Sequence, residues 1–333
     1  MSQLIDRFGR IHDYLRISVT DRCNLRCVYC MPPEGVQFIP HSELLTYEDI
    51  EKVVKVAAKL GIRKIRLTGG EPLVRKDIEI LVEKLSKIEG IEDIALTTNA
   101  IFLSQKAQAL KNAGLTRVNI SLDSLRPERF KEITRGGQLE RVLEGIDAAF
   151  RVGFQPIKIN TVLMRGFNDD EIGDFLRLTI DQPLQVRFIE YMPIGHADET
   201  WKNGYLSLNF VKEKAKELGF ELEESEGVFG NGPSENFRVK GSKGSIGFIH
   251  PVSDHFCTNC NRLRLTSDGN IKPCLYWEDE LNVKPYLDDE EELKQVFFRA
   301  LNIKPENHEM AKVLHNEKQT KMPTIRRMSQ IGG

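Results

Sequence analysis

Several features of secreted and membrane proteins are missing from this chain of 333 residues. No run of about 18 apolar residues occurs, so we expect no membrane-spanning helix. The opening stretch MSQLIDRFGRIHDYL lacks the apolar core of a secretory signal, which favours a cytoplasmic location. The formal net charge of −2 offers no basic excess for a nucleic-acid partner. Any anionic ligand must therefore be met by locally placed arginine and lysine side chains.

The phosphate-binding pattern GxxxxGK[ST] is also absent. The nearest stretch, GSKGS at 241–245, has the wrong spacing for a P-loop. This argues against a GTPase of that class, and it removes the reason to expect a fixed Mg²⁺. The sequence shows no repeat of about 20–50 residues and no low-complexity linker.

Cysteine is scarce and unevenly placed. Its six occurrences form two triplets, Cys23, Cys27 and Cys30 near the start and Cys257, Cys260 and Cys274 near the end. Cysteines that serve only in packing would be scattered through apolar segments. Disulfides are rare in a reducing cytoplasm, so two compact triplets indicate ligands of metals or clusters.

Short β-like segments alternate with helical patterns from about residue 14 to 218. The strand candidates are YLRISV, KIRLTG, IALTTN, RVNISLD, PIKINTVLM and VRFIEYM. A first helix is predicted, with Thr46 as its cap and Gly61 at its end. Its apolar residues recur at helical spacing, and they are Ile50, Val53, Val54, Ala57 and Leu60. Similar patterns predict helices around 76–88, 104–112, 138–152, 169–180 and 207–218.

Repeated βα units predict a parallel sheet with right-handed crossovers. Six units are too few for a closed eight-stranded barrel, so we predict an α/β fold with a partial (βα)6 TIM-like barrel over residues 1–225. A flat doubly wound sheet is the alternative, and both place the ligand at the C-terminal ends of the strands. Residues 226–333 begin in a Gly-, Ser- and Pro-rich stretch that predicts hairpins, and DDEEELKQVFFRAL predicts a later helix. We assign this part to a C-terminal α+β extension that covers the barrel mouth.

The first cysteine triplet follows the first predicted strand with the spacing C-x3-C-x2-C. Three thiolates can hold three irons of a [4Fe–4S] cluster and leave the fourth iron open to a small molecule. One zinc ion with a distant fourth ligand is the alternative, although zinc sites favour paired CxxC motifs. The stretch CNLRCVYC resembles the signature of the radical S-adenosylmethionine (SAM) superfamily. The resemblance implies that SAM binds the open iron and that its one-electron reduction releases a 5′-deoxyadenosyl radical.

Residues at successive strand ends resemble further SAM contacts of that superfamily. LTGGEP at 67–72 matches its GGE motif, which receives the SAM ammonium and includes Gly70, and SLDS at 121–124 matches a contact made by Ser121. Tyr29 and Met192 match positions beside the adenine, and Arg187 matches an arginine near SAM. Each alone is more often a core or turn residue. Together they fit one ligand lying across the barrel mouth.

The second triplet, C-x2-C-x13-C at 257–274, again leaves one ligand position open. One zinc ion with His250 or His255 as fourth ligand is the alternative. Beside a radical SAM motif, we predict an auxiliary [4Fe–4S] cluster. Arg262 and Arg264 alternate, so on an extended chain they face the same side and can hold an anionic substrate.

The combination resembles the GTP 3′,8-cyclase family of molybdenum cofactor biosynthesis. The matching stretches span nearly the whole chain, and they are CxxxCxxC, GGEP, SLDSL, KINTVLMRGFND, RFIEYMPIG, CNRLRLTSDG and the final IGG. One departure is TTNA at 97–100, where the family usually reads TTNG, and we expect an ordinary backbone conformation at Ala100. The resemblance implies GTP contacts at Arg16, Arg66, Thr97, Lys158, Arg262, Leu263 and Arg264. It also implies that the Gly332-Gly333 tail reaches into the active site, the alternative being a frayed chain end.

The same resemblance implies the reaction and the partners. GTP would become (8S)-3′,8-cyclo-7,8-dihydroguanosine 5′-triphosphate, with two [4Fe–4S] clusters as cofactors and SAM cleaved to methionine and 5′-deoxyadenosine. A homodimer, an unidentified electron donor and handoff of the product to cyclic pyranopterin monophosphate synthase are implied in the same way. Two rivals stay open: another radical SAM enzyme with an auxiliary cluster, such as a peptide modifier, and a non-catalytic zinc protein.

Overall fold

One sheet of twelve strands organises the molecule. The computed structural model describes residues 3–195, 199–225, 233–254 and 256–332. The strands are β1 (Tyr14–Ser18), β2 (Lys64–Thr68), β3 (Asp93–Thr98), β4 (Arg117–Ser121), β5 (Ile157–Leu163), β6 (Leu184–Glu190), β7 (Leu222–Glu224), β8 (Glu235–Val239), β9 (Ser245–Ile249), β10 (Arg262–Leu265), β11 (Asn270–Lys272) and β12 (Leu281–Asn282). Their order across the sheet is β12-β11-β10-β1-β2-β3-β4-β5-β6-β9-β8-β7.

Helices follow most of the early strands. The α-helices are α1 (Tyr47–Lys59), α2 (Ile78–Ser86), α3 (Leu103–Asn112), α4 (Pro127–Thr134), α5 (Leu139–Arg151), α6 (Ile172–Asp181), α7 (Glu199–Gly204), α8 (Asn209–Glu217), α9 (Glu290–Ile303), α10 (Met310–Leu314) and α11 (Met328–Ile331). Short 3-10 helices are η1 (His41–Glu43), η2 (Pro72–Val74), η3 (Cys257–Asn259) and η4 (Lys284–Tyr286). Within the described residues, no helix is both long enough and apolar enough to cross a bilayer.

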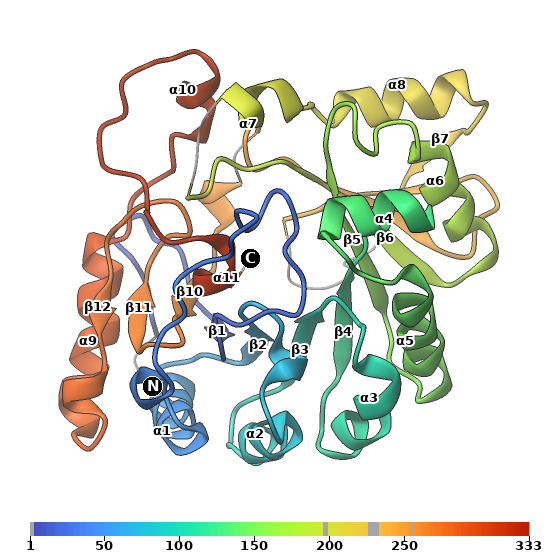
Figure 1. The fold of residues 1–333 in the computed structure, drawn as a ribbon. Helices are drawn as coiled ribbons and strands as arrows, with labels where there is room; N and C mark the ends of the chain where they lie inside the picture. Colours follow the sequence, from blue (N-terminus) through green and yellow to red (C-terminus); the bar gives the residue numbers. More distant parts are fainter. Residues whose placement is uncertain (1–2, 196–198, 226–232, 255, 333) are drawn as a thin grey trace.

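Strands β1 to β6 pair in chain order, and every pair is parallel. Figure 1 shows the strands as an open arc, with α1, α2, α3 and α5 along its outer side and the C-terminus near its centre. The predicted α/β fold with six βα units is confirmed. Because parallel strands end at one edge of their sheet, all six strands deliver the residues that follow them to the same mouth.

The first helix forms as its sequence pattern predicts. The Thr46 side chain accepts from the Asp49 N–H, and the Asp49 side chain accepts from the Thr46 N–H, which completes a capping box. Gly61, just past the helix, adopts a φ of +98°, which glycine reaches without a side-chain clash. The apolar stripe of α1 is buried against the sheet, so the helix is held mainly by packing.

The C-terminal part continues the sheet at both edges. β9 pairs in parallel with β6, and β10 pairs in parallel with β1. The predicted hairpin character is present where β8 pairs antiparallel with β9, and α9 forms where the acidic stretch predicts a helix. The division at residue 225 stays a prediction, since these later strands share one sheet with the earlier ones.

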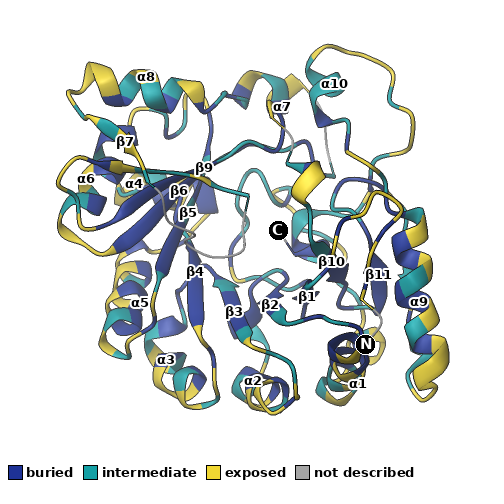
Figure 2. Cartoon of the chain, turned by 180° about the vertical axis from the view of Figure 1, so that it is seen from behind, coloured by how far each residue is buried: buried dark blue, intermediate teal, exposed yellow. Residues whose placement is uncertain are grey.

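Two apolar clusters stabilise the fold. The larger lies between the sheet and the outer helices, where Figure 2 shows the strands deeply buried and the outward helix faces exposed. The smaller cluster gathers Tyr191, Trp201, Tyr276, Trp277 and Ile331. Because Ile331 is 1% exposed in this cluster, the C-terminal helix α11 is anchored by burial of apolar surface.

One sequence expectation about the backbone is wrong. Ala100 has a φ of +63°, in the left-handed region, rather than an ordinary conformation. Side chains before it hold this turn, since Ala100 N–H donates to Thr98 Oγ1 at 2.9 Å and Ile101 N–H donates to Asn99 Oδ1 at 3.1 Å. A left-handed residue with a Cβ costs about 1–2 kcal/mol, which these contacts offset.

Candidate active site

The first cysteine triplet lies on the loop after β1. Cys30 N–H donates to the Cys27 carbonyl at 2.9 Å, which makes a tight turn, and all three cysteines are free thiols. Burial raises the pKa of Cys23 to about 11, and burial together with the neighbouring Cys23 raises the pKa of Cys30 to about 12. Three thiolates brought together in a buried loop repel one another, and bound iron would relieve that repulsion. This donor set fits an iron–sulfur cluster.

The GGE segment packs directly on this loop. Gly70 N–H donates to the Thr20 carbonyl at 2.8 Å, and Glu71 N–H donates to the Arg22 carbonyl at 2.8 Å. A Cβ on Gly70 would lie 2.3 Å from the Arg22 carbonyl oxygen, so only glycine fits there. The loop of the first triplet is therefore held by backbone contacts to the end of β2.

Glu71 orders the ends of two strands, as its place in the motif suggests. Its carboxylate accepts from Thr98 Oγ1 at 2.7 Å, from Asn99 N–H at 2.6 Å and from Leu73 N–H at 3.0 Å. Burial raises the pKa of Glu71 to about 7 in spite of these donors. Asn99 in turn donates to Asn24 Oδ1 at 2.9 Å, so this network reaches the loop of the first triplet.

Tyr29 is tied to a residue that sequence reasoning did not single out. Its hydroxyl donates to Asp123 Oδ2 at 2.8 Å, and Asp123 Oδ1 accepts from Val162 N–H at 2.9 Å. Burial raises the pKa of Asp123 to about 6. Ser121, the predicted SAM contact in the same SLDS stretch, is the last residue of β4 and is half-buried. The signal for Asp123 is an acidic residue at the end of the predicted strand RVNISLD.

The second triplet lines a cavity together with basic side chains. The residues in its wall include Cys257, Cys260, Cys274, Met192, Arg262, Arg264, Arg10 and Lys304. Burial raises the pKa of Cys260, but Lys304, Arg262 and Arg10 outweigh that effect and lower it to about 6. Sequence reasoning missed Arg10 and Lys304, because isolated cations in sequence look like surface residues. A thiolate surrounded by cations fits a ligand of iron.

The zinc alternative gains no support from the described residues. His250 lies 3.8 Å from Glu190 and 3.7 Å from Glu235, and it is not in the cavity wall. His255 lies outside the described residues. Across the described part of the chain, no three His, Cys, Asp or Glu side chains converge on a single-ion site. The choice between zinc and a cluster therefore rests on the family.

A basic pocket adjoins the cavity of the second triplet. Its wall includes Arg16, Arg66, Arg187, Arg262, Arg264 and Met192, of which Arg262, Arg264 and Met192 also line the cavity. Arg16 lies beside Arg66 on one side and beside Arg264 on the other in the strand register. Burial, and secondarily Arg66, lowers the pKa of Arg187 to about 9. Buried cations set against one another indicate an anionic ligand.

The remaining predicted GTP contacts divide into two groups. Lys158 is buried, and burial and then Arg187 lower its pKa to about 6, whereas Thr97 is half-buried. Thr97 Oγ1 and Nε of Arg66 are buried without a hydrogen-bond partner in the described structure. Leu263 instead packs in the main apolar core, so it faces away from the pocket, and only its main chain can contact a ligand.

The C-terminal tail lies inside the barrel. Arg264 Nη1 donates to the Gly332 carbonyl, and a Cβ on Gly332 would lie 2.3 Å from Thr68 Cγ2. The main chain of Ser329 and the Arg327 side chain favour the thiolate of Cys30 and oppose the rise in its pKa, so α11 lies near the first triplet as well. The frayed-end alternative is therefore wrong for Gly332, while Gly333 lies outside the described residues.

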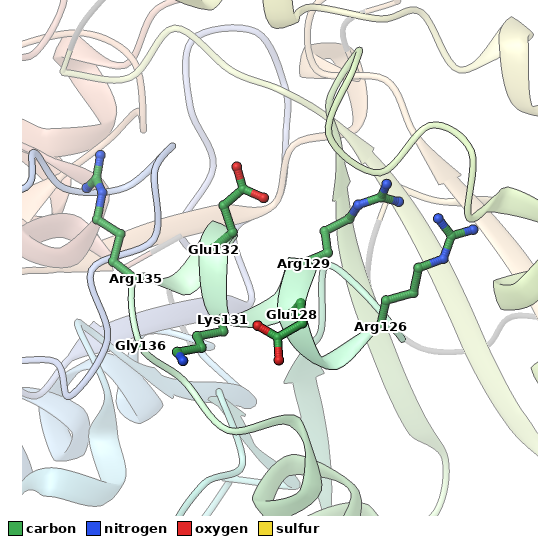
Figure 3. A pocket seen from close by; sticks show the side chains of 7 residues that line it. All are labelled: Arg126, Glu128, Arg129, Lys131, Glu132, Arg135 and Gly136. Carbon is green, nitrogen blue, oxygen red and sulfur yellow. The ribbon is translucent and has the colours of Figure 1, made fainter.

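A shallow hollow on the outer surface is unlike this interior pocket. Figure 3 shows the side chains of α4 and of the residues flanking it that line this hollow, with both signs of charge. Arg126 and Arg129 both pair with Asp170, while Arg135 donates to the Met31 carbonyl at 2.7 Å. Three of its four cations, Arg126, Arg129 and Arg135, are already paired with acids or main chain, so the hollow offers little charge to an anion.

Comparisons with known proteins identify the family. The radical SAM superfamily model matches residues 17–179, and the Molybdenum Cofactor Synthesis C model matches residues 184–310. A Listeria monocytogenes protein named GTP 3′,8-cyclase is 59% identical over 333 residues, covering 100% of both chains. A Limosilactobacillus fermentum protein of the same name is 51% identical with the same coverage. This chain belongs to the GTP 3′,8-cyclase family.

Membership in the GTP 3′,8-cyclase family confirms the predicted enzyme class and function, and it makes a non-catalytic zinc protein wrong. SAM and an iron–sulfur cluster are the cofactors of this superfamily. Among solved structures, SAM-bound SuiB of Streptococcus suis has a TM-score of 0.58 and 17% identity, covering 85% of this chain and 66% of that one. The structure of anSMEcpe with bound AdoMet has a TM-score of 0.54 and 17% identity, covering 90% and 79%. At such identity these two structures show the shared fold alone.

Proposed function

We propose that this GTP 3′,8-cyclase family member carries two [4Fe–4S] clusters and binds GTP between them. Cys23, Cys27 and Cys30 would hold the cluster that binds SAM. The second triplet would hold the cluster that faces the substrate. The observation that carries this proposal is the shared wall of the basic pocket and the second cavity, which includes Met192, Arg262 and Arg264.

SAM would lie where the ends of the early strands meet the first loop. Gly70 leaves room for close approach of the backbone, and Tyr29, Ser121, Arg187 and Met192 are the proposed side-chain contacts. When bound, the first cluster and SAM supply a 5′-deoxyadenosyl radical for removal of one hydrogen atom. The role of the protein is to hold the substrate so that only the hydrogen on ribose C3′ lies within reach of that radical.

The triphosphate would occupy the basic pocket. Arg16, Arg66, Arg262 and Arg264 offer guanidinium donors, which bind phosphate oxygens through paired hydrogen bonds. Lys158 and Thr97 would serve the deeper end of the ligand. Because these cations are buried and repel one another, an anion is stabilised there more strongly than at an exposed site. The wall shared with the second triplet supports a position of the guanine end of the same ligand beside that cavity.

Further parts of the proposal rest on the resemblance alone. They are a homodimer in the cytoplasm, an electron donor of unknown identity, and transfer of the product to cyclic pyranopterin monophosphate synthase. The Gly332-Gly333 tail would act at the site, which agrees with the contact between Gly332 and Arg264.

Iron and sulfide analysis of anaerobically reconstituted protein tests the two-cluster proposal. The chain should hold about eight irons, and a Cys27→Ser/Cys30→Ser variant and a Cys260→Ser/Cys274→Ser variant should each hold about four. Because either double variant keeps the other triplet, each serves as the control for its counterpart. A chain with about four irons, unchanged in the Cys260→Ser/Cys274→Ser variant, would contradict the second cluster.

A further inference from the structure

Two buried cations from distant parts of the chain lie against the second cysteine triplet. Lys304 directly follows α9, and Arg10 lies in the segment before β1. Both line the cavity that contains Cys257, Cys260 and Cys274, with exposed fractions of 3% and 8%. Burying a charged side chain is costly unless another charge or several polar atoms compensate it. The contacts of each cation therefore show which segments it holds together and whether its charge is neutralised.

Lys304 bridges the two arms of the triplet. Its Nζ donates to the Arg262 carbonyl at 2.9 Å and to the Pro273 carbonyl at 2.5 Å. Arg262 follows Cys260 by two residues, and Pro273 directly precedes Cys274. One ammonium thus links the start of β10, two residues after the second cysteine, to the segment just before the third cysteine.

The charge of Lys304 is not paired with an acid. Within the described part of the chain, no carboxylate lies at ion-pair distance from it, and its recorded hydrogen bonds go to main-chain carbonyls. Carbonyl dipoles compensate a buried ammonium only in part. The remaining positive charge faces the cavity, where three thiolates would gather around a bound cluster.

Arg10 makes a different set of contacts. Its Nε donates to Asp6 Oδ2 at 2.6 Å, so its charge is neutralised by a carboxylate. Its Nη1 donates to the Cys257 carbonyl at 2.8 Å, and its Nη2 donates to the Pro305 carbonyl at 2.7 Å. Arg10 therefore links the first cysteine of the triplet to the segment that begins with Lys304, while Lys304 adds a charge that no acid neutralises.

We infer that Lys304 is a positioning residue for the second cluster, which it holds in place and whose reduction potential it raises. This inference rests on the proposed two-cluster function. Net charge and hydrogen bonding around the sulfurs set the potential of an iron–sulfur cluster. A nearby uncompensated cation stabilises the reduced state, which carries one more negative charge. Removing that cation makes the cluster harder to reduce.

The test uses the full chain with the first triplet removed, Cys23→Ala/Cys27→Ala/Cys30→Ala, so that all iron signals come from the second triplet. Iron content and the absorbance and EPR spectra are followed through an anaerobic redox titration. In this background, Lys304→Met should lower the reduced-to-oxidised ratio at a fixed potential at least tenfold, a shift of about 59 mV for one electron. Lys304→Arg should keep the parent potential. Lys294→Met is the matched control and should leave the potential unchanged, because it removes a lysine of α9 that is paired with Glu290 and Glu291 and does not line the cavity.

Different failures lead to different conclusions. A parent chain without iron would overturn the second cluster and the role of Lys304 together. A parent that holds a cluster, with Lys304→Met at the same potential and iron content, would overturn the role of Lys304 alone. If Lys304→Met loses the cluster entirely, the reduction potential is measured in Lys304→Gln instead. This variant keeps a hydrogen-bond donor but removes the charge. An unshifted potential in that variant would equally overturn the inference.

Discussion

The hydroxyl of Tyr29 donates a 2.8 Å hydrogen bond to the buried carboxylate of Asp123. This contact joins the loop of the first cysteine triplet to the residues that follow β4. It thereby connects two of the segments that the proposed SAM site requires. The loop holding the first cluster is positioned by a side-chain pair as well as by the backbone contacts of Gly70 and Glu71.

Loss of this hydrogen bond should destabilise the chain measurably. Tyr29→Phe leaves one oxygen of the buried Asp123 without its donor, so we expect the free energy of unfolding to fall by about 1–3 kcal/mol. Tyr47→Phe is the matched control, since the Tyr47 hydroxyl donates to the Lys76 carbonyl at an exposed site. Urea denaturation of cluster-free protein measures both. Equal losses in the two variants would show that burial of the Asp123 carboxylate carries no special cost.

Arg66 should contribute to GTP affinity through the phosphates. Its Nε is buried without a partner in the described structure, and its side chain lines the basic pocket. A lost charge-assisted hydrogen bond costs about 1.5–3 kcal/mol, so Arg66→Leu should raise the GTP dissociation constant by roughly tenfold or more. Calorimetry with GTP and with guanosine measures this effect. Arg177→Leu removes an arginine that is 60% exposed and should leave both affinities unchanged. An equal loss for guanosine would argue against a phosphate contact.

Gly332 should be required for cyclisation because a residue with a Cβ does not fit at its position in the tail. Gly332 has a φ of +69°, and its missing Cβ would collide with Thr68. Gly332→Ala should displace the tail from Arg264 and lower the cyclisation rate at least tenfold, while the melting temperature changes little. Gly219→Ala tests backbone strain alone, since Gly219 has a φ of +79° with no atom within 4 Å of the added Cβ. Rates that fall equally in both variants would point to strain rather than to the tail contact.

Stability should depend on pH through His12. Burial, and then Lys304, lowers the pKa of His12 from 6.5 to about 4, and Asp6 and Arg10 also face its ring. At a pH between these two pKa values, the unfolded chain binds more protons than the folded one. The free energy of unfolding therefore falls as the pH drops from 6.5 to about 4. The loss attributable to His12 is at most about 3 kcal/mol. His12→Gln should flatten this dependence in urea denaturation, whereas His315→Gln, at an exposed position, should retain it.

The two cysteine triplets should separate two activities. Cys27→Ser should abolish SAM cleavage, because the first loop would lose a ligand of the cluster that binds SAM. Cys260→Ser should impair cyclisation of GTP and leave some uncoupled cleavage of SAM to 5′-deoxyadenosine. Chromatography of both products after anaerobic incubation distinguishes the variants. Unchanged cyclisation in Cys260→Ser would remove the substrate-binding role from the second triplet.

Local sequence patterns were sufficient to predict the repeated βα units of the fold. The apolar spacing of Ile50, Val53 and Val54 and the cap at Thr46 predicted α1, because these signals act within a few turns of chain. The pairing of β10 with β1 and of β9 with β6 was not predictable in this way. It joins segments far apart in sequence, and no local pattern records which edge of the sheet a late strand will meet. The short helix α4 was also missed, and it buries only Phe130, Ile133 and Thr134 among mostly charged residues.

The residues of the site likewise differ in whether local sequence reveals them. The cysteine triplets and the GGE segment are motifs, so spacing alone drew attention to them. Asp123 and Lys304 are single charged residues whose burial depends on the complete fold, and nothing local to either shows it. Ala100 was assigned an ordinary backbone because alanine usually has one. The contacts of Thr98 and Asn99 override that preference.

The most direct test of the account is mass spectrometry of the products after anaerobic incubation of the reconstituted chain with SAM, GTP and a reductant. The product is an isomer of GTP, so it must be separated from GTP by chromatography before its mass is read. We predict 5′-deoxyadenosine and a new species of GTP mass in equal amounts. Formation of 5′-deoxyadenosine without that isomer, from protein shown to hold both clusters, would contradict the proposed cyclisation.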